Sequence, residues 1–463
     1  MPYPDLRGFV EKLEKEGEIT KVKTEVDIKY EVGAICRWNL NHKNQALFFE
    51  KPIGYSIPIA AGLLDSRSRY YLAMETNREN FCHEFLKRAE QSIPPRLVKN
   101  GPCKENILLG KDADLFKFPI PTWNDKDGGP YITLGIAIVK DPDTGVRNMG
   151  VYRHMVHDGQ NIGILAPQHR QLAQFAKKLH ERGQTLPVAI SIGQDPVVTA
   201  SAIVALPPGK DELGLAGALR GEPVDLVKCE TIPLEVPATA EIIIEGEIQP
   251  GNMREEGIFG EFPGYYTGER MPRPVISIKA ITHRNNPIFE CCYEGRPPTC
   301  DSVTQILTHE AQIMGLVQPF GLRKIRMCVG SAMFMAIASI RKEFAGQERS
   351  IAVAILGTPS GNWIKTLIMV DEDIDPDNWT DVEWALGTRF QPGEDTLILQ
   401  GMAGRVLDPS ISREDAKVGH ARTSKMIIDA TRPVHRPYAE ECKPKPDIME
   451  KVIANWDKFG IPL

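Results

Sequence analysis

The 463-residue sequence lacks the short motifs that mark several common enzyme classes. It contains no Gly-x-Gly-x-x-Gly, no P-loop, no His-Glu-x-x-His and no Gly-x-Ser-x-Gly. These motifs supply a dinucleotide-binding turn, a phosphate cradle, two zinc ligands and a nucleophilic serine, respectively. Their absence argues against the commonest forms of dinucleotide binding, nucleotide hydrolysis, zinc peptidase chemistry and esterase chemistry.

Long apolar runs and localised charge are also missing. No apolar run approaches the roughly 20 residues that span a bilayer, and residues 1–5 lack the basic and apolar regions of a secretion signal. The net charge is −6 with both signs interspersed, which gives no footprint for nucleic acid or an anionic membrane. The nine cysteines include no Cys-x-x-Cys, as is typical of reduced thiols. We expect a cytoplasmic protein that binds neither nucleic acid nor membrane.

Hydrophobic patterning predicts an α/β multidomain chain. Residues 1–114 combine helical patterns over 5–20 and 76–98 with strands over 22–32 and 45–59, as in an α/β domain. Residues 115–295 are rich in short β runs separated by turn signals, which favours a barrel or sandwich, and we expect a barrel. Its expected elements are a helix over 168–182 and strands over 132–139, 150–157, 187–192, 201–206, 225–229, 240–248 and 275–281.

The last third of the chain is expected to form a linker, a third domain and a terminal helix. Residues 296–320 begin with a helical pattern and join the domains, so we expect a linker helix and hinge there. Residues 321–445 read as a second α/β domain, with strands over 325–329, 351–356, 366–370 and 396–399. Residues 446–463 carry an apolar stripe of Ile448, Val452, Ile453 and Trp456, which predicts a helix that packs on another subunit.

The stretch 254–266 is where we expect chemistry. It places Glu256 and Glu261 five residues apart, among glycines that disfavour regular helix or strand. Two carboxyls near each other, or near an arginine, acquire different pKa values, and so one can donate a proton while the other balances charge. On composition alone, a solvated acidic turn explains the same residues.

The barrel segment also contains three residues, upstream of this stretch, that could together bind a divalent metal. Asn148, His169 and Glu212 offer an amide oxygen, an imidazole and a carboxylate, a donor set suited to Mn²⁺ or Mg²⁺ with a phosphate as further ligand. The spacing is weak evidence, because a histidine at a helix start is often a cap or surface residue, and an asparagine is often a turn residue.

Six motifs follow one another along the barrel segment. They are Asn-Met-Gly-Val-Tyr-Arg at 148–153, Pro-Gln-His at 167–169, Asp-Glu-Leu-Gly-Leu-Ala-Gly at 211–217, Gly-Glu-Pro-Val-Asp-Leu-Val-Lys-Cys at 221–229, Val-Pro-Ala-Thr-Ala-Glu-Ile-Ile-Ile-Glu-Gly at 236–246 and Glu-Gly-Ile-Phe-Gly-Glu-Phe-Pro-Gly-Tyr at 256–265. In their order and spacing they resemble the UbiD family of decarboxylases, and six motifs in family order outweigh any single match. The resemblance extends from the N-terminal domain to Ser424-Lys425-Met426 and Asp429-Ala430-Thr431.

The resemblance implies a split-barrel flavin domain and a role for each site residue. Arg153, Glu256 and Glu261 would form a Glu–Arg–Glu network beside prenylated FMN, with Glu261 as the proton donor. The metal ligands would be Asn148, His169 and Glu212, holding Mn²⁺ against the cofactor phosphate, and K⁺ is expected as well. The remaining cofactor contacts would be Val151, Tyr152, Arg153, Leu165, Ala166, Pro167, Gln168, Arg170, Gln171 and Lys425. Gln168 would also face the substrate, as could His309, although a surface position on a helix explains His309 equally well.

The implied activity is reversible, non-oxidative decarboxylation of an aromatic, heteroaromatic or α,β-unsaturated acid. Loss of CO₂ from an sp² carbon leaves an electron pair that side chains cannot accept, and so a cofactor must do so. A separate flavin prenyltransferase would supply that cofactor, the small-molecule acid and CO₂ would be the ligands, and the assembly would be a homodimer or homohexamer. The alternatives are the catalytic subunit of a multi-subunit carboxylase complex and a flavin-binding protein without catalysis.

Overall fold

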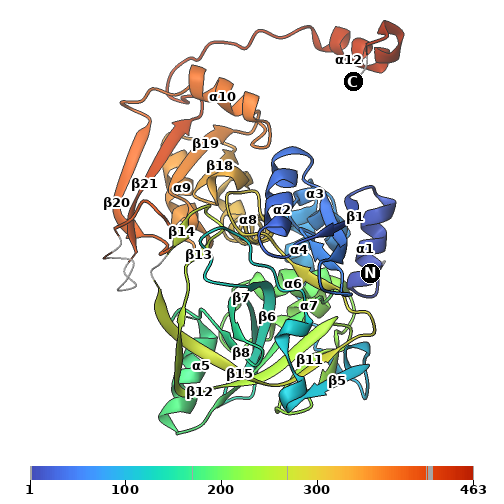
Figure 1. Cartoon of the computed structure of the whole chain (residues 1–463). Coiled ribbons are helices and arrows are strands. Elements are labelled where there is room, and N and C mark those ends of the chain that lie inside the picture. The colour runs from blue at the N-terminus through green and yellow to red at the C-terminus, as the bar shows by residue number, and fades with distance from the viewer. Residues whose placement is uncertain (1–2, 169, 268–269, 413, 415–420, 462–463) are drawn as a thin grey trace.

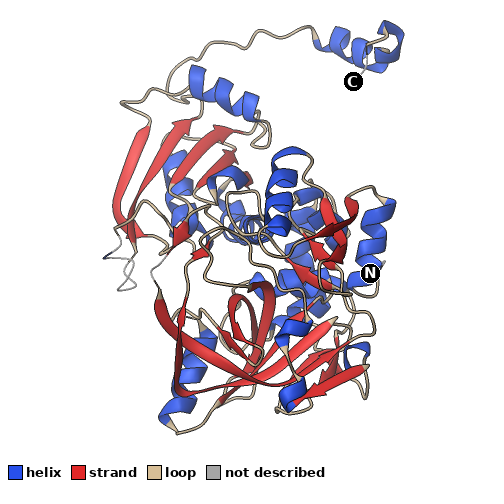
Figure 2. Cartoon of the chain, viewed as in Figure 1, coloured by secondary structure: helices blue, strands red, loops and turns tan. Residues whose placement is uncertain are grey.

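The computed structural model describes residues 3–168, 170–267, 270–412, 414 and 421–461 (Figures 1 and 2). The expected fold class is confirmed: along the sequence an α/β domain, an antiparallel barrel, a second α/β domain and a terminal helix follow one another. Figure 1 shows the barrel on one side of the molecule, with the N-terminal and C-terminal domains beside each other on the other side.

The N-terminal domain is a small sheet covered by helices. Its strands lie in the order β1-β2-β3-β16, and the last of them comes from the far end of the barrel segment. Helix α1 starts where Asp5 accepts a hydrogen bond from Gly8 N at 3.1 Å, as an N-cap should. The elements are α1 (Leu6–Lys15), β1 (Ile19–Val26), α2 (Glu31–His42), β2 (Ala46–Pro52), β3 (Ile59–Ala61), α3 (Arg67–Met74), α4 (Phe81–Ala89) and β16 (Phe289–Cys291).

Six strands close the central barrel. They run in the order β12-β9-β6-β7-β8-β15, and β15 pairs again with β12 to complete the ring. Branched apolar side chains such as Ile190, Ile244 and Ile276 fill its interior. The barrel strands are β6 (Tyr131–Lys140), β7 (Arg147–Asp158), β8 (Asn161–Gly163), β9 (Leu186–Ile192), β12 (Ile242–Glu256) and β15 (Met271–His283), with β5 (Asn106–Leu109) paired to β15 outside the ring.

Two expected barrel strands are wrong. Residues 201–206 include the end of a helix, α6 (Pro196–Ile203), which begins with Pro196 after an Asp195 side chain that accepts from Val197 N at 2.8 Å. That pairing of cap and proline is a helix start signal. Residues 225–229 do form a strand, β10 (Asp225–Lys228), but it pairs with β11 (Glu235–Pro237) and β4 (Arg96–Leu97) in a separate sheet. Helices α5 (Gln171–Glu181) and α7 (Glu212–Arg220) pack against the barrel.

The C-terminal domain is a five-stranded sheet in the order β17-β18-β19-β21-β20. The strand expected over 351–356 is wrong, because this segment lies in α9 (Gln347–Gly357). Ile351, Ala352 and Ile355 are buried and Val353 is exposed, which is a helical period. The other elements are α8 (Cys300–Val317), β17 (Leu322–Met327), β18 (Met335–Ile340), β19 (Thr366–Asp371), α10 (Trp379–Thr388), β20 (Thr396–Ala403) and β21 (Arg422–Ala430).

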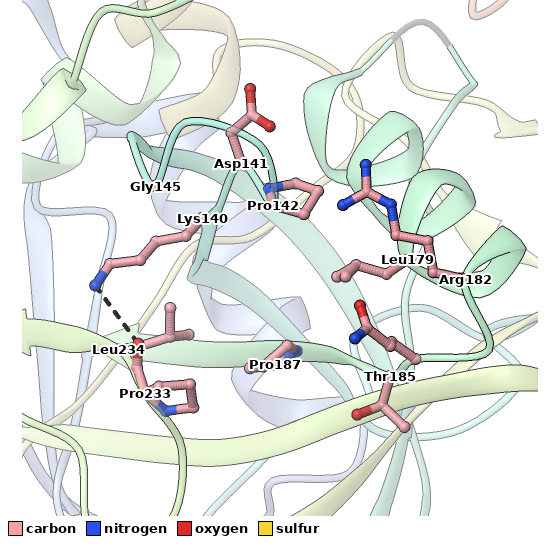
Figure 3. Close-up of a pocket in the computed structure, with 11 residues that line it drawn as sticks. Lys140, Asp141, Pro142, Gly145, Leu179, Arg182, Thr185, Pro187, Pro233 and Leu234 are labelled. Atoms are coloured by element: carbon pink, nitrogen blue, oxygen red, sulfur yellow. Dashed lines mark hydrogen bonds between the residues drawn. The ribbon is translucent and has the colours of Figure 1, made fainter.

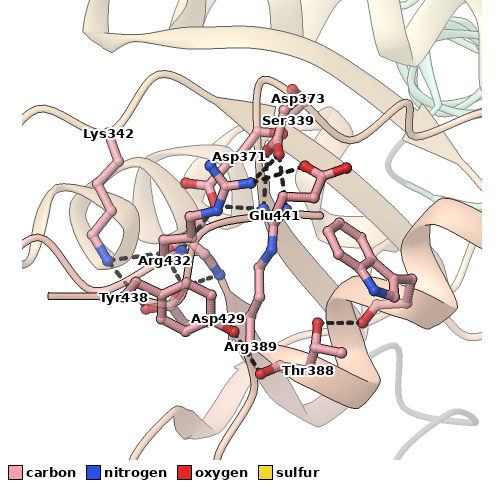
Figure 4. Close-up of polar contacts among 12 residues, drawn as sticks. Ser339, Lys342, Asp371, Asp373, Thr388, Arg389, Asp429, Arg432, Tyr438 and Glu441 are labelled. Atoms are coloured by element: carbon pink, nitrogen blue, oxygen red, sulfur yellow. Dashed lines mark hydrogen bonds and ion pairs between the residues drawn. The ribbon is translucent and has the colours of Figure 1, made fainter. Parts of the chain in front are cut away.

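The segment that follows β21, which we call the C-terminal arm, is hydrogen-bonded to the C-terminal domain at its start. Arg432 N donates to Asp371 at 2.8 Å, and Tyr438 Oη donates to the carbonyl of Thr388 at 2.7 Å (Figure 4). Arg389 also donates to Asp371 at 2.7 Å from the same group of side chains. Beyond these hydrogen bonds, α12 (Pro446–Ala454) stands away from the body of the molecule (Figure 1).

Candidate active site

An arginine clamped between two glutamates lies where the barrel meets the other domains. Arg153, on β7, donates from Nε to Glu256 Oε1 at 3.0 Å and from Nη2 to Glu256 Oε2 at 3.1 Å. Its Nη1 donates to Glu261 Oε1, and its guanidinium lies over the ring of Phe259, 5.2 Å from the centroid. The side chains of Arg153, Glu256 and Glu261 are 12%, 2% and 10% exposed, so this network is shielded from water.

The loop that carries both glutamates is held by backbone contacts. β12 ends at Glu256, and Glu261 follows the short strand β13 (Phe259–Gly260), which pairs with β14 (Tyr266–Thr267). Asp127 accepts from Gly260 N at 2.9 Å, and burial raises the pKa of Asp127 to about 6. A side chain on Gly257 would stand 2.3 Å from the Cα of Gly128, so glycine is needed there for the two segments to touch.

A cavity opens beside this network and is lined by the barrel segment, the start of α8 and the C-terminal domain. Arg153 and Glu261 lie on its wall together with Val151, Tyr152, Leu165, Pro167 and Arg170, all of them predicted site residues. Sequence reasoning missed other lining residues, among them Glu294 and Trp363. Glu294 follows strand β16 and Trp363 belongs to the C-terminal domain, and neither lies in a motif that the sequence analysis identified.

Two of the three predicted metal ligands lie together. Asn148 Nδ2 donates to Glu212 Oε1 at 3.0 Å, and Met149 N donates to Glu212 Oε2 at 3.0 Å. Asn148 therefore keeps its amide oxygen for another partner. Burial raises the pKa of Glu212 to about 7, as expected of a carboxyl that lacks a counter-charge. His169 lies outside the described residues, and within them no group of three His, Cys, Asp or Glu side chains could hold a metal.

Three cations around the cavity suit a phosphate group. Lys425 is fully buried, with Nζ donating to the carbonyl of Gly361 at 2.8 Å. Burial, and then the charge of Arg405, lowers the pKa of Lys425 to about 8. Arg405 lies over Trp363 at 4.5 Å and Arg170 over Tyr152 at 5.9 Å. Among the described residues, no carboxylate forms an ion pair with any of the three, so an anionic ligand would find its counter-charge there.

Four further predicted residues lie around the cavity without lining it. Ala166 packs against the barrel core, Gln168 is exposed, and Gln171 begins α5. His309, half-buried, has Nδ1 at 3.1 Å from Ser360 Oγ and its ring 6.1 Å from that of Trp363. Burial lowers the pKa of His309 to about 4, so it is a neutral imidazole behind the cavity wall.

A second hollow lies on the outer surface of the barrel, between α5 and the 233–234 turn (Figure 3). Its charged groups already have partners. Lys140 pairs with Glu235 at 2.8 Å, and Arg182 pairs with Asp143. None of the predicted site residues lines it, and we place no chemistry there. In the part of the chain that the structure describes, no helix is long and apolar enough to cross a bilayer.

Comparison with known proteins places a chain with this fold among the carboxy-lyases. Three family models match successive parts of the chain. They are the N-terminal domain of 3-octaprenyl-4-hydroxybenzoate carboxy-lyase at residues 10–89, its Rift-related domain at 96–297 and its C-terminal domain at 302–430. The chain belongs to the UbiD family.

Solved structures of this class cover nearly the whole chain. HmfF from Pelotomaculum thermopropionicum, in complex with FMN, is 34% identical and has a TM-score of 0.89 over 98% of this chain and 100% of its own. An evolved dimeric form of HmfF, in complex with prFMN, is 33% identical and has a TM-score of 0.85 over 98% of this chain and 99% of its own. The vanillic acid decarboxylase of Sedimentibacter hydroxybenzoicus, in an open form, is 33% identical and has a TM-score of 0.87 over 99% of this chain and 98% of its own.

Proposed function

We propose that this chain decarboxylates an aromatic, heteroaromatic or α,β-unsaturated carboxylic acid with the help of prenylated FMN. The observation that carries the proposal is the buried Arg153 held between Glu256 and Glu261 on a cavity wall. Burying three charged side chains is costly unless the arrangement is used. HmfF in complex with prFMN and a vanillic acid decarboxylase share this fold, which supports both the cofactor and the substrate class.

The residues around the cavity suit that cofactor. Lys425, Arg405 and Arg170 would hold its phosphate, while Asn148 and Glu212, with His169, would hold Mn²⁺ against the phosphate. K⁺ is a further expected ion, without assigned ligands. When bound, prenylated FMN supplies the electron sink that accepts the pair left by CO₂.

Arg153 would orient the substrate carboxylate. A guanidinium has five N–H groups, and the two glutamates accept hydrogen bonds from three of them. One N–H on Nη1 and one on Nη2 remain, and these two would donate to the oxygens of a substrate carboxylate. Glu256 accepts from two nitrogens of Arg153 and so would fix the guanidinium plane during turnover.

Glu261 would move the proton. It contacts Arg153 from the cavity wall, where it can protonate the carbon that CO₂ leaves. Closure of the cavity by the C-terminal domain would exclude water, so that this carbon meets only the intended donor. In the reverse direction the same carboxylate would remove the proton before CO₂ adds, because a reversible step uses the same groups both ways.

The test is Glu261→Gln, which keeps size and hydrogen bonding but has no carboxylic proton. General acid–base catalysis is worth about 10²–10⁴-fold, so CO₂ release and hydrogen–deuterium exchange at the reacting carbon in D₂O should both fall by at least that order. Flavin and metal contents should stay at wild-type levels. Near-normal turnover and exchange with full flavin would mean that another residue donates the proton, with Glu256 the first to examine.

Two further features of the proposal concern partners. A separate flavin prenyltransferase would make the cofactor, and the protein would act in the cytoplasm as a homodimer or homohexamer. The exposed apolar side chains of α12, with Ile448 and Ile453 at 49% and 65% exposed, support an oligomer. A non-catalytic flavin carrier has no use for a buried arginine–glutamate network, and membership of a larger carboxylase complex is compatible with the same site.

A further inference from the structure

One wall of the cavity carries acids that the decarboxylation mechanism does not use. It is built from Cys292, Glu294, Asp301, Thr304 and Gln305, which we call the 292–305 wall. The first two residues follow strand β16, and the other three lie on the first turns of α8. Arg153 and Glu261 lie on other segments of the same cavity, so a substrate held by Arg153 has this wall within its surroundings.

Within this wall, Glu294 has one carboxyl oxygen that lacks a hydrogen-bond partner among the described residues. Its side chain is only 6% exposed, and Cys292 Sγ donates to its Oε1 at 3.1 Å. Its Oε2 is buried and has no hydrogen-bond partner among the described residues. The neighbouring Thr304 Oγ1 donates to Cys300 O at 2.8 Å, and Asp301 Oδ1 accepts from Gln305 at 2.7 Å. A buried polar atom left unpaired is costly, and a ligand is one way of pairing it.

The charge on Glu294 decides what kind of group it can pair with. Burial, followed by the nearby Cys292 and Asp301, raises its pKa well above the usual value. Burial thus favours the neutral form of the carboxyl, which can donate from its O–H and accept at its other oxygen. Such a group suits an uncharged hydroxyl or a ring N–H. A second carboxylate would instead be a charge placed against the buried carboxyls of Glu294 and Asp301, whose pKa burial also raises.

We propose that Glu294 is a specificity-determining residue that hydrogen-bonds the substrate. It selects acids that carry an uncharged hydrogen-bonding group, either a hydroxyl or a ring N–H, over unsubstituted acids and over dicarboxylic acids. This inference rests on the proposed function, because Arg153 must hold the carboxylate of the same molecule.

The experiment compares matched acids on the FMN-loaded protein by titration of flavin fluorescence. The probes are benzoate against its 3-hydroxy and 4-hydroxy derivatives, 2-furoate against pyrrole-2-carboxylate, and terephthalate as a dicarboxylate. A site built to bond a hydroxyl or N–H discriminates strongly against an analogue that lacks it. We expect the best hydroxylated or N–H acid to bind at least about 10-fold more tightly than its partner, and terephthalate to bind more weakly than either.

Three variants assign that discrimination to Glu294. Glu294→Leu should reduce the ratio of Kd values to within about twofold, because the side chain can no longer hydrogen-bond. Glu294→Gln, which still donates and accepts, should retain part of it. Glu290→Gln is the matched control: Glu290 is 1% exposed with both oxygens unpartnered among the described residues, yet it does not line the cavity. It should keep the wild-type ratio.

The outcomes separate this inference from the proposed function. If the prenylated-FMN enzyme releases CO₂ from these acids but Glu294→Leu keeps the wild-type ratio, the assignment of Glu294 is wrong and the proposed function stands. If the ratio of Kd values is already near one in the wild-type protein, the assignment of Glu294 is wrong in the same way. If no acid binds and none is decarboxylated, the proposed function fails and this inference fails with it.

Discussion

Replacing Arg153 by methionine should loosen the active-site end of the barrel. The methionine keeps an apolar stem over Phe259 but removes the guanidinium, which now makes hydrogen bonds to two buried glutamates. Glu256 is 2% exposed and Glu261 10%, so water cannot replace the lost partner. The carboxylates would be left buried without their main counter-charge.

The structure sets the size of this effect. Removing one partner of a buried ion pair costs about 3–5 kcal/mol. Arg153 is 12% exposed and bonds Glu256 through two nitrogens, so its pair qualifies as buried. The loss of stability should be local, because the pair ties β7 to the end of β12 and to the loop that follows. In a protein of several domains, a local measurement is also clearer than a single unfolding transition.

Hydrogen-exchange mass spectrometry of the flavin-free protein measures this loss of stability segment by segment. Peptides that cover 147–158 and 242–260 should exchange about 10²- to 10⁴-fold faster in Arg153→Met, the factor that corresponds to about 3–5 kcal/mol. Arg273→Met is the matched control, since Arg273 reaches the same Glu256 only at 3.5 Å and its side chain is 28% exposed. This longer contact comes from a less buried arginine and should hold the loop less firmly, so exchange should rise less in Arg273→Met than in Arg153→Met.

The reasoning would be refuted by equal exchange in the two variants. Equal exchange would mean that Glu256 and Glu261 find other partners or water when Arg153 is removed, and that the network does not hold the loop. Unchanged exchange in Arg153→Met together with lost turnover would separate the two roles of this residue. The arginine would then serve the substrate alone.

Three further predictions concern the metal, the phosphate and the assembly. Glu212→Ala should lose Mn²⁺ and retain flavin more weakly, as measured by elemental analysis and flavin absorbance; full metal occupancy would contradict the ligand set. FMN affinity should be constant between about pH 7 and pH 8, above the second ionisation of its phosphate at about pH 6. Above pH 8 the affinity should fall by up to about tenfold per pH unit, because the pKa of Lys425 is about 8 and the phosphate prefers its charged form. Lys425→Met should bind weakly without this pH dependence, and a wild-type affinity that rises with pH would contradict the sign. Truncation after residue 445 should reduce the oligomer seen by light scattering, and an unchanged oligomer would leave the arm without a role in assembly.

The identity of the candidate active-site residues could be predicted from motifs, but the contacts between them could not. Arg153 lies 103 residues before Glu256 in sequence, and only the sheet places β7 near the end of β12. Ordered motifs identified both residues, since each motif keeps its local spacing. The contact between Gly128 and Gly257, which lets the segments approach, has no signal in either local sequence.

Other features could not be predicted because they are properties of the tertiary structure. Residues 351–356 form an apolar run that is too short to distinguish strand from helix, and only its burial against the sheet settles the matter. The unpaired Oε2 of Glu294 depends on burial, which a sequence does not display. Arg405 had a faint signal in the nearby Gly401 and Gly404, because glycines often occur where backbone donors meet anions.

The position of the expected hinge can be narrowed by the packing of α8. This helix contacts α4 on one side and both β17 and α9 on the other, and its N-terminus is fixed by a capping box between Thr299 and Ser302. A helix packed on both sides moves as a rigid body more easily than it bends. After its last turn, residues 318–320 are exposed, and Gly321 has a φ of +110°, a backbone state that favours glycine. α8 takes part in two cores, because Val303 and Leu307 belong to the N-terminal core and Ile306, Ile313 and Met314 to the C-terminal core. A rotation of the C-terminal domain about the corner at 318–321 would break the contacts of α8 with β17 and α9, so this corner alone is not expected to serve as the hinge.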